Sequence, residues 1–237
     1  MSFILCLETS TKACSVALGQ NGKLLALKES LDENYSHSEN LTLFIEDVCK
    51  QAKIKLQDVD AIAVSKGPGS YTGLRIGVST AKGLCYALDK PLIAINSLEA
   101  MAAGQISILN TQYPTLLCPM IDARRMEVYT AVYDEKMNEI FPTSAEIIDE
   151  TFLSKIGNAQ YSIHNTQYYF FGDGAAKCKQ IISHPNAIFI NDINPSAKSM
   201  LPIAEKYFSE KRFEDVAYFE PFYLKDFVDT SKKSGSP

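Results

Sequence analysis

The chain has 237 residues, of which 46% are hydrophobic and 22% are charged, and its formal net charge is −5. These proportions are typical of a folded globular protein, and the length is sufficient for two small lobes. An acidic chain with scattered Lys and Arg is a poor binder of nucleic-acid backbones on its own, because that binding depends on clustered cations.

Six cysteines are spread along the chain without a Cys-x-x-Cys pair, and the three histidines show no ligand spacing. This pattern argues against a zinc site and against a disulfide framework. No apolar run approaches the roughly 18 residues that cross a membrane, and the first residues lack the positive charge of a signal peptide. We expect reduced, buried thiols, no bound metal, no membrane association and a cytoplasmic location.

The chain opens with three predicted strands, over 3–7, 14–18 and 23–30. A polar turn, Glu8-Thr9-Ser10, follows the first strand, and Asn21-Gly22 joins the other two as a hairpin. A helix is predicted over 37–52, because Ser36 and Glu39 form a capping box and apolar residues recur at helical spacing.

A glycine-rich stretch, 65–77, follows a short apolar run and opens a second predicted helix that ends near Leu88. Ser70 or Thr72 is expected to cap it. Gly73, Gly77 and Ala81 recur every fourth residue and form a smooth strip along one helix face. Interior glycines cost about 1 kcal/mol each relative to alanine. Two interpretations stay open: the strip lies flat on the chain's own sheet, or it contacts a helix of another protein.

The stretch Gly-Pro-Gly-Ser-Tyr-Thr-Gly-Leu-Arg-Ile-Gly, together with Ile-Leu-Cys-Leu-Glu-Thr-Ser near the start, resembles the TsaB family, formerly called YeaZ. The resemblance covers most of residues 3–104 and is thin in the remainder. It implies an α/β fold of the two-lobed, actin-like ATPase (ASKHA, ribonuclease H-like) type, in which each lobe is a mixed sheet with helices. It also implies a non-catalytic scaffold for TsaD, which with TsaE places a threonylcarbamoyl group on the adenosine beside the anticodon of certain tRNAs.

By this resemblance, the helices over 37–52 and from Gly73 to Leu88 meet two equivalent helices of TsaD. TsaE is expected to join through that complex, tRNA to meet this chain only indirectly, and a homodimer to form on the same surface when TsaD is missing. The residues expected at this contact are Leu41, Phe44, Ile45, Val48, Gly73, Arg75, Ile76, Gly77, Thr80, Ala81 and Leu84.

Two loops stand where actin-like relatives bind nucleotide. Glu8, Thr9 and Ser10 keep the acid and hydroxyls of the first loop but lack its glycine, and Gly172-Asp173-Gly174 stands where relatives face the adenosine. No complete phosphate-loop motif is present. We expect no cofactor, with ATP or ADP and magnesium at the partner interface as the open alternative. Both loops also have a structural interpretation as hydrogen-bonded turns.

The second half repeats the opening, with strands predicted at 116–121, 128–133 and 139–141 and the acid-headed turn Asp122-Ala123-Arg124 after the first of them. This duplication favours two lobes built from one unit. Asp122 and Arg124 are expected to form either an intraloop salt bridge or a functional pair.

A short helix at 152–156, a strand at 168–171 and a helix over 197–208 complete the second half, with Pro202 expected to break that last helix near Leu201. We expect an amino-terminal lobe at 1–104, a carboxy-terminal lobe at 105–229 and a disordered tail at 230–237. Residues 219–225, Phe-Glu-Pro-Phe-Tyr-Leu-Lys, resemble the family's carboxy-terminal motif, with Lys225 in place of Arg.

No residue is predicted to be catalytic. The sequence lacks the Gly-x-Ser-x-Gly elbow of serine hydrolases, which argues against a peptidase. Phosphoryl transfer needs metal-holding carboxylates and phosphate-cradling loops, and both loops here depart from the pattern of such enzymes. The alternatives to a scaffold are an actin-like ATPase or small-molecule kinase that acts alone and, less favoured, a peptidase.

Overall fold

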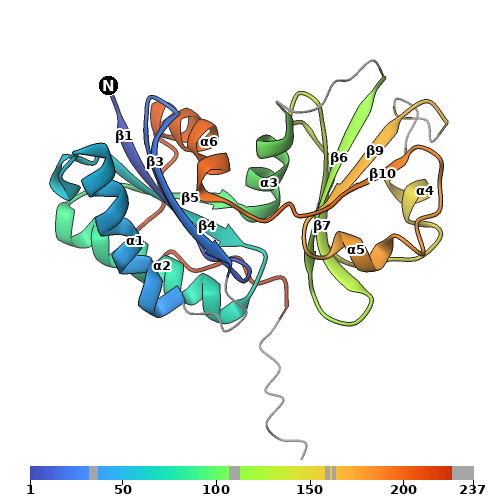
Figure 1. The fold of residues 1–237 in the computed structure, drawn as a ribbon, viewed down its shortest axis with the longest axis horizontal. Coiled ribbons are helices and arrows are strands. Elements are labelled where there is room, and N and C mark those ends of the chain that lie inside the picture. Colours follow the sequence, from blue (N-terminus) through green and yellow to red (C-terminus); the bar gives the residue numbers. More distant parts are fainter. Residues whose placement is uncertain (32–36, 107–112, 158–160, 162–163, 226–237) are drawn as a thin grey trace, which may run out of the picture.

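The computed structural model describes residues 1–31, 37–106, 113–157, 161 and 164–225. Two five-stranded sheets stand side by side, each with helices packed against it (Figure 1). The first contains β1 (Phe3–Glu8), β2 (Ala13–Gln20), β3 (Lys23–Leu31), β4 (Ala61–Gly67) and β5 (Leu92–Asn96). The second contains β6 (Thr115–Asp122), β7 (Glu127–Asp134), β8 (Glu139–Ile147), β9 (Gln167–Phe171) and β10 (Ala187–Ile190).

Both sheets have the same topology. The strand order of the first sheet is β3-β2-β1-β4-β5, and that of the second is β10-β9-β6-β7-β8. Written from its other edge, the second order is β8-β7-β6-β9-β10, so β6 to β10 take the places of β1 to β5. In each sheet the first strand is antiparallel to the second and parallel to the fourth. This repetition confirms the two-lobed α/β fold. The sequence analysis missed β10, a four-residue strand at the edge of the second sheet.

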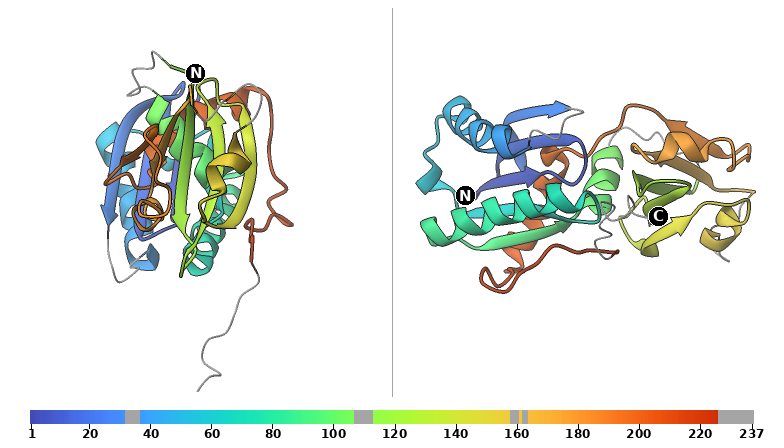
Figure 2. Two further views of the ribbon diagram at one scale, coloured as in Figure 1. Left: turned by 90° about the vertical axis from the view of Figure 1, so that its right-hand side faces the viewer. Right: turned by 90° about the horizontal axis from the view of Figure 1, so that it is seen from below.

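Helices cover both faces of the first sheet. Leu5 and Leu7 of β1 pack with α1 (His37–Ala52) and α2 (Tyr71–Leu88), whereas Ile4 and Cys6 pack with α6 (Ala197–Ser209) on the opposite face. This two-sided burial explains why β1 is a continuous apolar run rather than an alternating one. The view from below shows α2 lying along the outer surface of the lobe (Figure 2).

The remaining helices are short or lie between the lobes. Between the two sheets, α3 (Ser97–Ile106) shares an apolar cluster with Ile121 of β6 and Phe171 of β9 (Figure 1). The helices α4 (Phe152–Ile156) and α5 (Ala175–Cys178) pack on the second sheet, and a 3₁₀ turn, Leu56–Asp58, precedes β4.

The predicted cap of α2 forms, whereas Ser36 of the predicted capping box before α1 lies outside the described residues. Ser70 Oγ accepts a hydrogen bond from the Gly73 N–H at 3.3 Å and caps α2. Asn96 Oδ1 accepts from the Leu98 N–H at 2.8 Å and caps α3. All six cysteines are buried and unpaired with one another. Within the described ranges, no helix is both long and apolar enough to span a membrane.

The last helix differs from the prediction in two respects. First, α6 packs on the first sheet, although the expected boundary assigned it to the second lobe. Met200, Leu201 and Ala204 supply an apolar stripe for the sheet face that α1 and α2 leave uncovered. Second, α6 continues past Pro202 without a break, because this burial on the sheet outweighs one lost backbone hydrogen bond. The tail predicted at 230–237 lies outside the described residues.

The end of the described chain crosses from the first lobe toward the second, and we call residues 213–225 the carboxy-terminal strap. The Glu214 N–H donates to the Leu92 carbonyl at 2.9 Å, and the Phe222 N–H donates to the Lys66 carbonyl at 2.7 Å. At its end, Lys225 forms an ion pair with Glu127 of β7. The strap therefore adds a third link between the two lobes, besides the connection from α3 to β6 and the segment that leads into α6.

Two glycines of α2 give a matched stability test. A methyl group added at Gly77 would collide with Thr9 Oγ1, whereas one added at Gly83 would meet no neighbouring atom within 4 Å in the described structure. We expect Gly77→Ala to destabilise the protein by about 1–3 kcal/mol through overpacking. Gly83→Ala is expected to stabilise it by about 1 kcal/mol through helix propensity. Urea unfolding of both variants measures this, and equal effects would contradict the assigned packing.

Candidate functional site

The glycine loop before α2 is held against the turn between β1 and β2. The Ser70 N–H donates to the Ser10 carbonyl at 2.6 Å, and Thr9 Oγ1 donates to the Gly73 carbonyl at 2.8 Å. Both Thr9 and Ser10 are fully buried. The smooth strip of α2 therefore packs against its own lobe, with its glycines at this turn. Of the two interpretations that the sequence left open, this agrees with the first, a contact within the chain, rather than with a contact to another protein.

Most of the residues predicted to contact a partner are part of the protein's own core. The predicted residues of α1 pack in the core against the sheet, and the small residues of α2 lie either against the β1–β2 turn or in that same core. These side chains are covered by the protein's own lobe in this conformation, so a partner contact at these positions stays a prediction. The buried residues are Leu41, Phe44, Ile45, Val48, Gly73, Gly77 and Ala81.

The rest of the predicted contact set is not fully buried: Arg75 is exposed and Ile76, Thr80 and Leu84 are partly exposed, although Ile76 and Leu84 also pack against the core. Gly83 and Tyr86 lie on the same side of the helix as Arg75, and Tyr86 is 87% exposed. At about 100° per residue, Gly83 falls near the middle of the exposed arc. We define the α2 ridge as Arg75, Ile76, Thr80, Gly83 and Tyr86.

Sequence reasoning missed Gly83 and Tyr86 because both fall outside the regular spacing of Gly73, Gly77 and Ala81. The available signal was the helical phase: positions opposite the apolar residues of an amphipathic helix are the exposed ones. A glycine there costs helix stability without relieving any clash within the described chain.

Glu8 is completely buried at the end of β1. Its Oε1 accepts hydrogen bonds from the Ser10 N–H at 2.6 Å and from the Ser65 hydroxyl at 2.9 Å. Its Oε2 has no hydrogen-bond partner among the described residues, and burial raises the pKa of this carboxyl. Glu8 thus organises the turn in this conformation, and a phosphate or metal ion would reach it only if the turn opened.

The second predicted nucleotide loop also has a local explanation. Gly172 has φ +105°, and a Cβ there would collide with the Met120 carbonyl oxygen. Asp173 Oδ1 accepts the Asp122 N–H at 3.0 Å, and the Gly174 N–H donates to the Met120 carbonyl at 3.0 Å. The close approach to the end of β6 therefore accounts for the glycines at this turn.

The turn between β6 and β7 is held by a lysine that the sequence analysis did not single out. Lys177 of α5 forms an ion pair with Asp122 and donates hydrogen bonds to the Arg125 and Glu127 carbonyls at 2.8 and 2.7 Å. The Arg124 backbone N–H, rather than its side chain, donates to Asp122 Oδ1 at 2.8 Å. The predicted pair is thus a backbone contact, and Lys177 is the charged partner of Asp122.

The structure holds the predicted nucleotide residues in two hydrogen-bonded turns, one in each lobe. The part of the chain that it describes contains no group of three or more His, Cys, Asp or Glu side chains suited to a metal ion. The α2 ridge, by contrast, has a glycine that no contact among the described residues explains.

Comparisons with known proteins agree with the fold. The family described as "TsaD: tRNA N6-adenosine threonylcarbamoyltransferase" matches residues 33–231. A protein of Haemophilus influenzae named "tRNA threonylcarbamoyladenosine biosynthesis protein TsaB" is 32% identical, over 98% of this chain and 97% of that protein. The protein of the same name from Escherichia coli is 30% identical, over 98% of both chains. The solved structure "YeaZ from Pseudomonas aeruginosa" matches with a TM-score of 0.78 and 26% identity, over 94% of this chain and 100% of that one.

The buried carboxyl of Glu8 predicts a pH-dependent stability. Because its pKa is higher in the folded protein, the unfolded state loses this proton first as the pH rises, so stability falls above the ordinary carboxyl pKa of 4.5. Because glutamine does not titrate, we expect Glu8→Gln to remove this loss and to be more stable than the parent at pH 7. A pKa that differs by one between the folded and unfolded states corresponds to about 1.4 kcal/mol of stability. Chemical denaturation from acidic to neutral pH measures the difference, and a variant less stable at pH 7 than the parent would refute the assignment.

Proposed function

The chain belongs to the TsaB (YeaZ) family and has a role in tRNA threonylcarbamoyladenosine biosynthesis, and we propose that it acts there as a non-catalytic scaffold that binds TsaD. In this proposal TsaD carries out the threonylcarbamoylation of the adenosine next to the anticodon. TsaE joins through the complex, and tRNA meets this chain only indirectly.

The observation that carries the proposal is the α2 ridge. Gly83 lowers helix stability, and a side chain at this position would have free space around it in the described structure. A bare backbone patch allows a neighbouring helix to approach closely, and Tyr86 beside it is the kind of aromatic anchor that contributes strongly to protein interfaces. Leu43, 58% exposed on α1, extends the apolar surface of this helix layer. A homodimer through the same ridge is the proposed state when TsaD is absent.

The buried first turn supports a non-catalytic role. In actin-like enzymes this turn holds phosphate, but here Thr9 and Ser10 are fully buried and hydrogen-bonded to the neighbouring α2 segment. Opening the turn would break the contacts that hold the start of α2. Nucleotide binding at the interface with TsaD is retained only as an alternative.

A bulky charge on the ridge should block the complex while the monomer stays folded. We expect Gly83→Arg to weaken binding to TsaD of the same organism at least about thirtyfold, as for loss of an interface hot spot. The reconstituted tRNA modification should fall with it. Ala176→Arg, at an exposed position of α5 in the second lobe, is the matched control and should bind normally. Isothermal titration measures both, and normal binding by a folded Gly83→Arg variant would refute the ridge as the contact.

The rival function, an actin-like ATPase or small-molecule kinase that acts alone, is tested without a partner. We expect no heat of binding and no phosphate release when the purified chain is mixed with ATP and Mg²⁺, because the first turn is closed. Tight binding with turnover would favour the rival over the scaffold. Hydrolysis of a general peptide substrate would likewise favour the peptidase alternative.

A further inference from the structure

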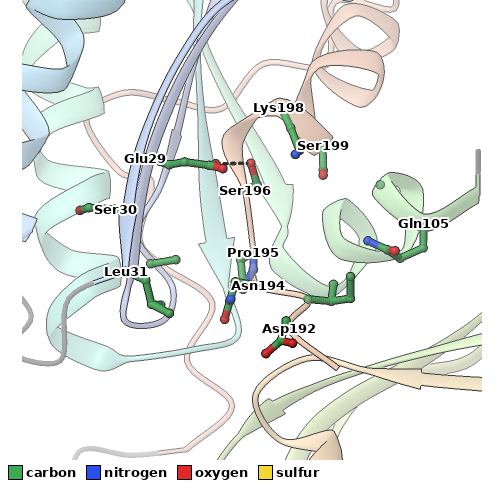
Figure 3. A pocket seen from close by; sticks show the side chains of 13 residues that line it. Glu29, Ser30, Leu31, Gln105, Asp192, Asn194, Pro195, Ser196, Lys198 and Ser199 are labelled. Atoms are coloured by element: carbon green, nitrogen blue, oxygen red, sulfur yellow. Dashed lines mark hydrogen bonds between the residues drawn. The ribbon is translucent and has the colours of Figure 1, made fainter. Parts of the chain in front are cut away.

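A pocket of about 480 Å³ opens in the seam between the lobes, and no residue of α1 or α2 lines it. Its walls are the start of β2, the end of β3, the last turn of α3 and the segment that leads from β10 into α6 (Figure 3). That segment joins the second sheet to a helix of the first lobe. The pocket is therefore distinct from the proposed partner surface, the α2 ridge. It is also distinct from the two turns that hold the predicted nucleotide residues, one after β1 and one after β9.

One wall carries a buried acceptor that is not used. Gln105, in the last turn of α3, is 8% exposed, and its Oε1 has no hydrogen-bond partner in the described structure. Its side chain points into the pocket (Figure 3). Buried polar atoms are normally paired, so this free acceptor indicates an occupant with a hydrogen-bond donor.

The pocket also carries fixed and unpaired charges. Glu29 Oε2 accepts hydrogen bonds from the Ser15 hydroxyl at 3.1 Å and the Ser196 hydroxyl at 2.7 Å, which holds this carboxylate at the wall (Figure 3). Asp192 and Lys198 lie at other sides of the pocket, and neither forms an ion pair with a described residue.

The first turn of α6 provides the other half of the site. Ser196, its N-cap residue, gives its hydroxyl to Glu29 and does not cap the helix. The first N–H of this 13-residue helix, that of Ala197, instead donates to Ser15 Oγ at 3.0 Å. Lys198, in the same first turn, adds a positive charge at the pocket wall, where the helix dipole also favours a carboxylate.

These groups match a ligand that carries opposite charges at its two ends. An ammonium supplies hydrogen-bond donors that suit the unpaired Gln105 Oε1 and the negative charges of Glu29 and Asp192, and a carboxylate suits Lys198 in the first turn of α6. A phosphate fits less well, because two carboxylates and one ammonium line the pocket. Leu31, Ile193 and Pro195 add an apolar wall for a side chain. We propose that this pocket binds a small zwitterion of the amino-acid class.

The full chain is to be tested with free L-amino acids, their N-acetyl derivatives and their carboxamides. Saturation-transfer NMR reports binding, and thermal unfolding reports stabilisation by ligand. We expect at least one free amino acid to bind and to raise Tm, and its two blocked forms to do neither, because each lacks one charge. The proposal is overturned if no free amino acid binds, or if the blocked forms bind equally well.

Two variants separate a binding site from ordinary packing. Gln105→Leu keeps the volume and removes the amide, so we expect affinity to fall about tenfold or more while the free protein is no less stable. Lys198→Met should weaken binding similarly, and Lys206→Met, at the other end of α6, is the control that should bind as the parent does. Unchanged affinity in both Gln105→Leu and Lys198→Met would show that these side chains serve packing and would end the proposal.

Discussion

The contact between the β1–β2 turn and the start of α2 determines the rest of this structure. Ser10 and Ser70 are joined by a backbone hydrogen bond, Thr9 bonds the Gly73 carbonyl, and Glu8 bonds Ser65 at the end of β4. Glycine is required where the backbones meet, because a Cβ at Gly69 would collide with the Ser10 carbonyl oxygen. This contact keeps the β1–β2 turn closed and fixes α2 on the lobe.

That contact also decides which surface of α2 is available. With Gly73 and Gly77 turned inward, the outer side presents Gly83 and Tyr86 instead. The helix thus uses small residues on both sides for different reasons: inside to approach its own chain, and outside, in our proposal, to admit a partner. The pocket beside α6 lies on the other face of the same sheet, so the two proposed sites can be occupied independently.

Sequence patterns predicted the elements of this fold well wherever the signal is local. The Asn21-Gly22 hairpin, the Ser70 cap and the extent of α1 follow from residues that contact one another within a few positions. Contacts between distant segments were not predictable in the same way. Spacing showed that Gly77 needs a close neighbour but could not say whether that neighbour was Thr9 or another protein. The position of α6 on the first sheet, and the pairing of Lys177 with Asp122, likewise depend on how remote segments meet.

The carboxy-terminal strap and α6 have a consequence for how the protein is made. Synthesis on the ribosome delivers the first sheet early, but the helix that covers its second face and the strand-like contact with Leu92 come from the last part of the chain. Ile4, Cys6 and their neighbours must therefore stay uncovered while the whole second lobe is translated. The amino-terminal lobe is encoded first and completed last, which makes the nascent chain dependent on its final segment for protection against aggregation.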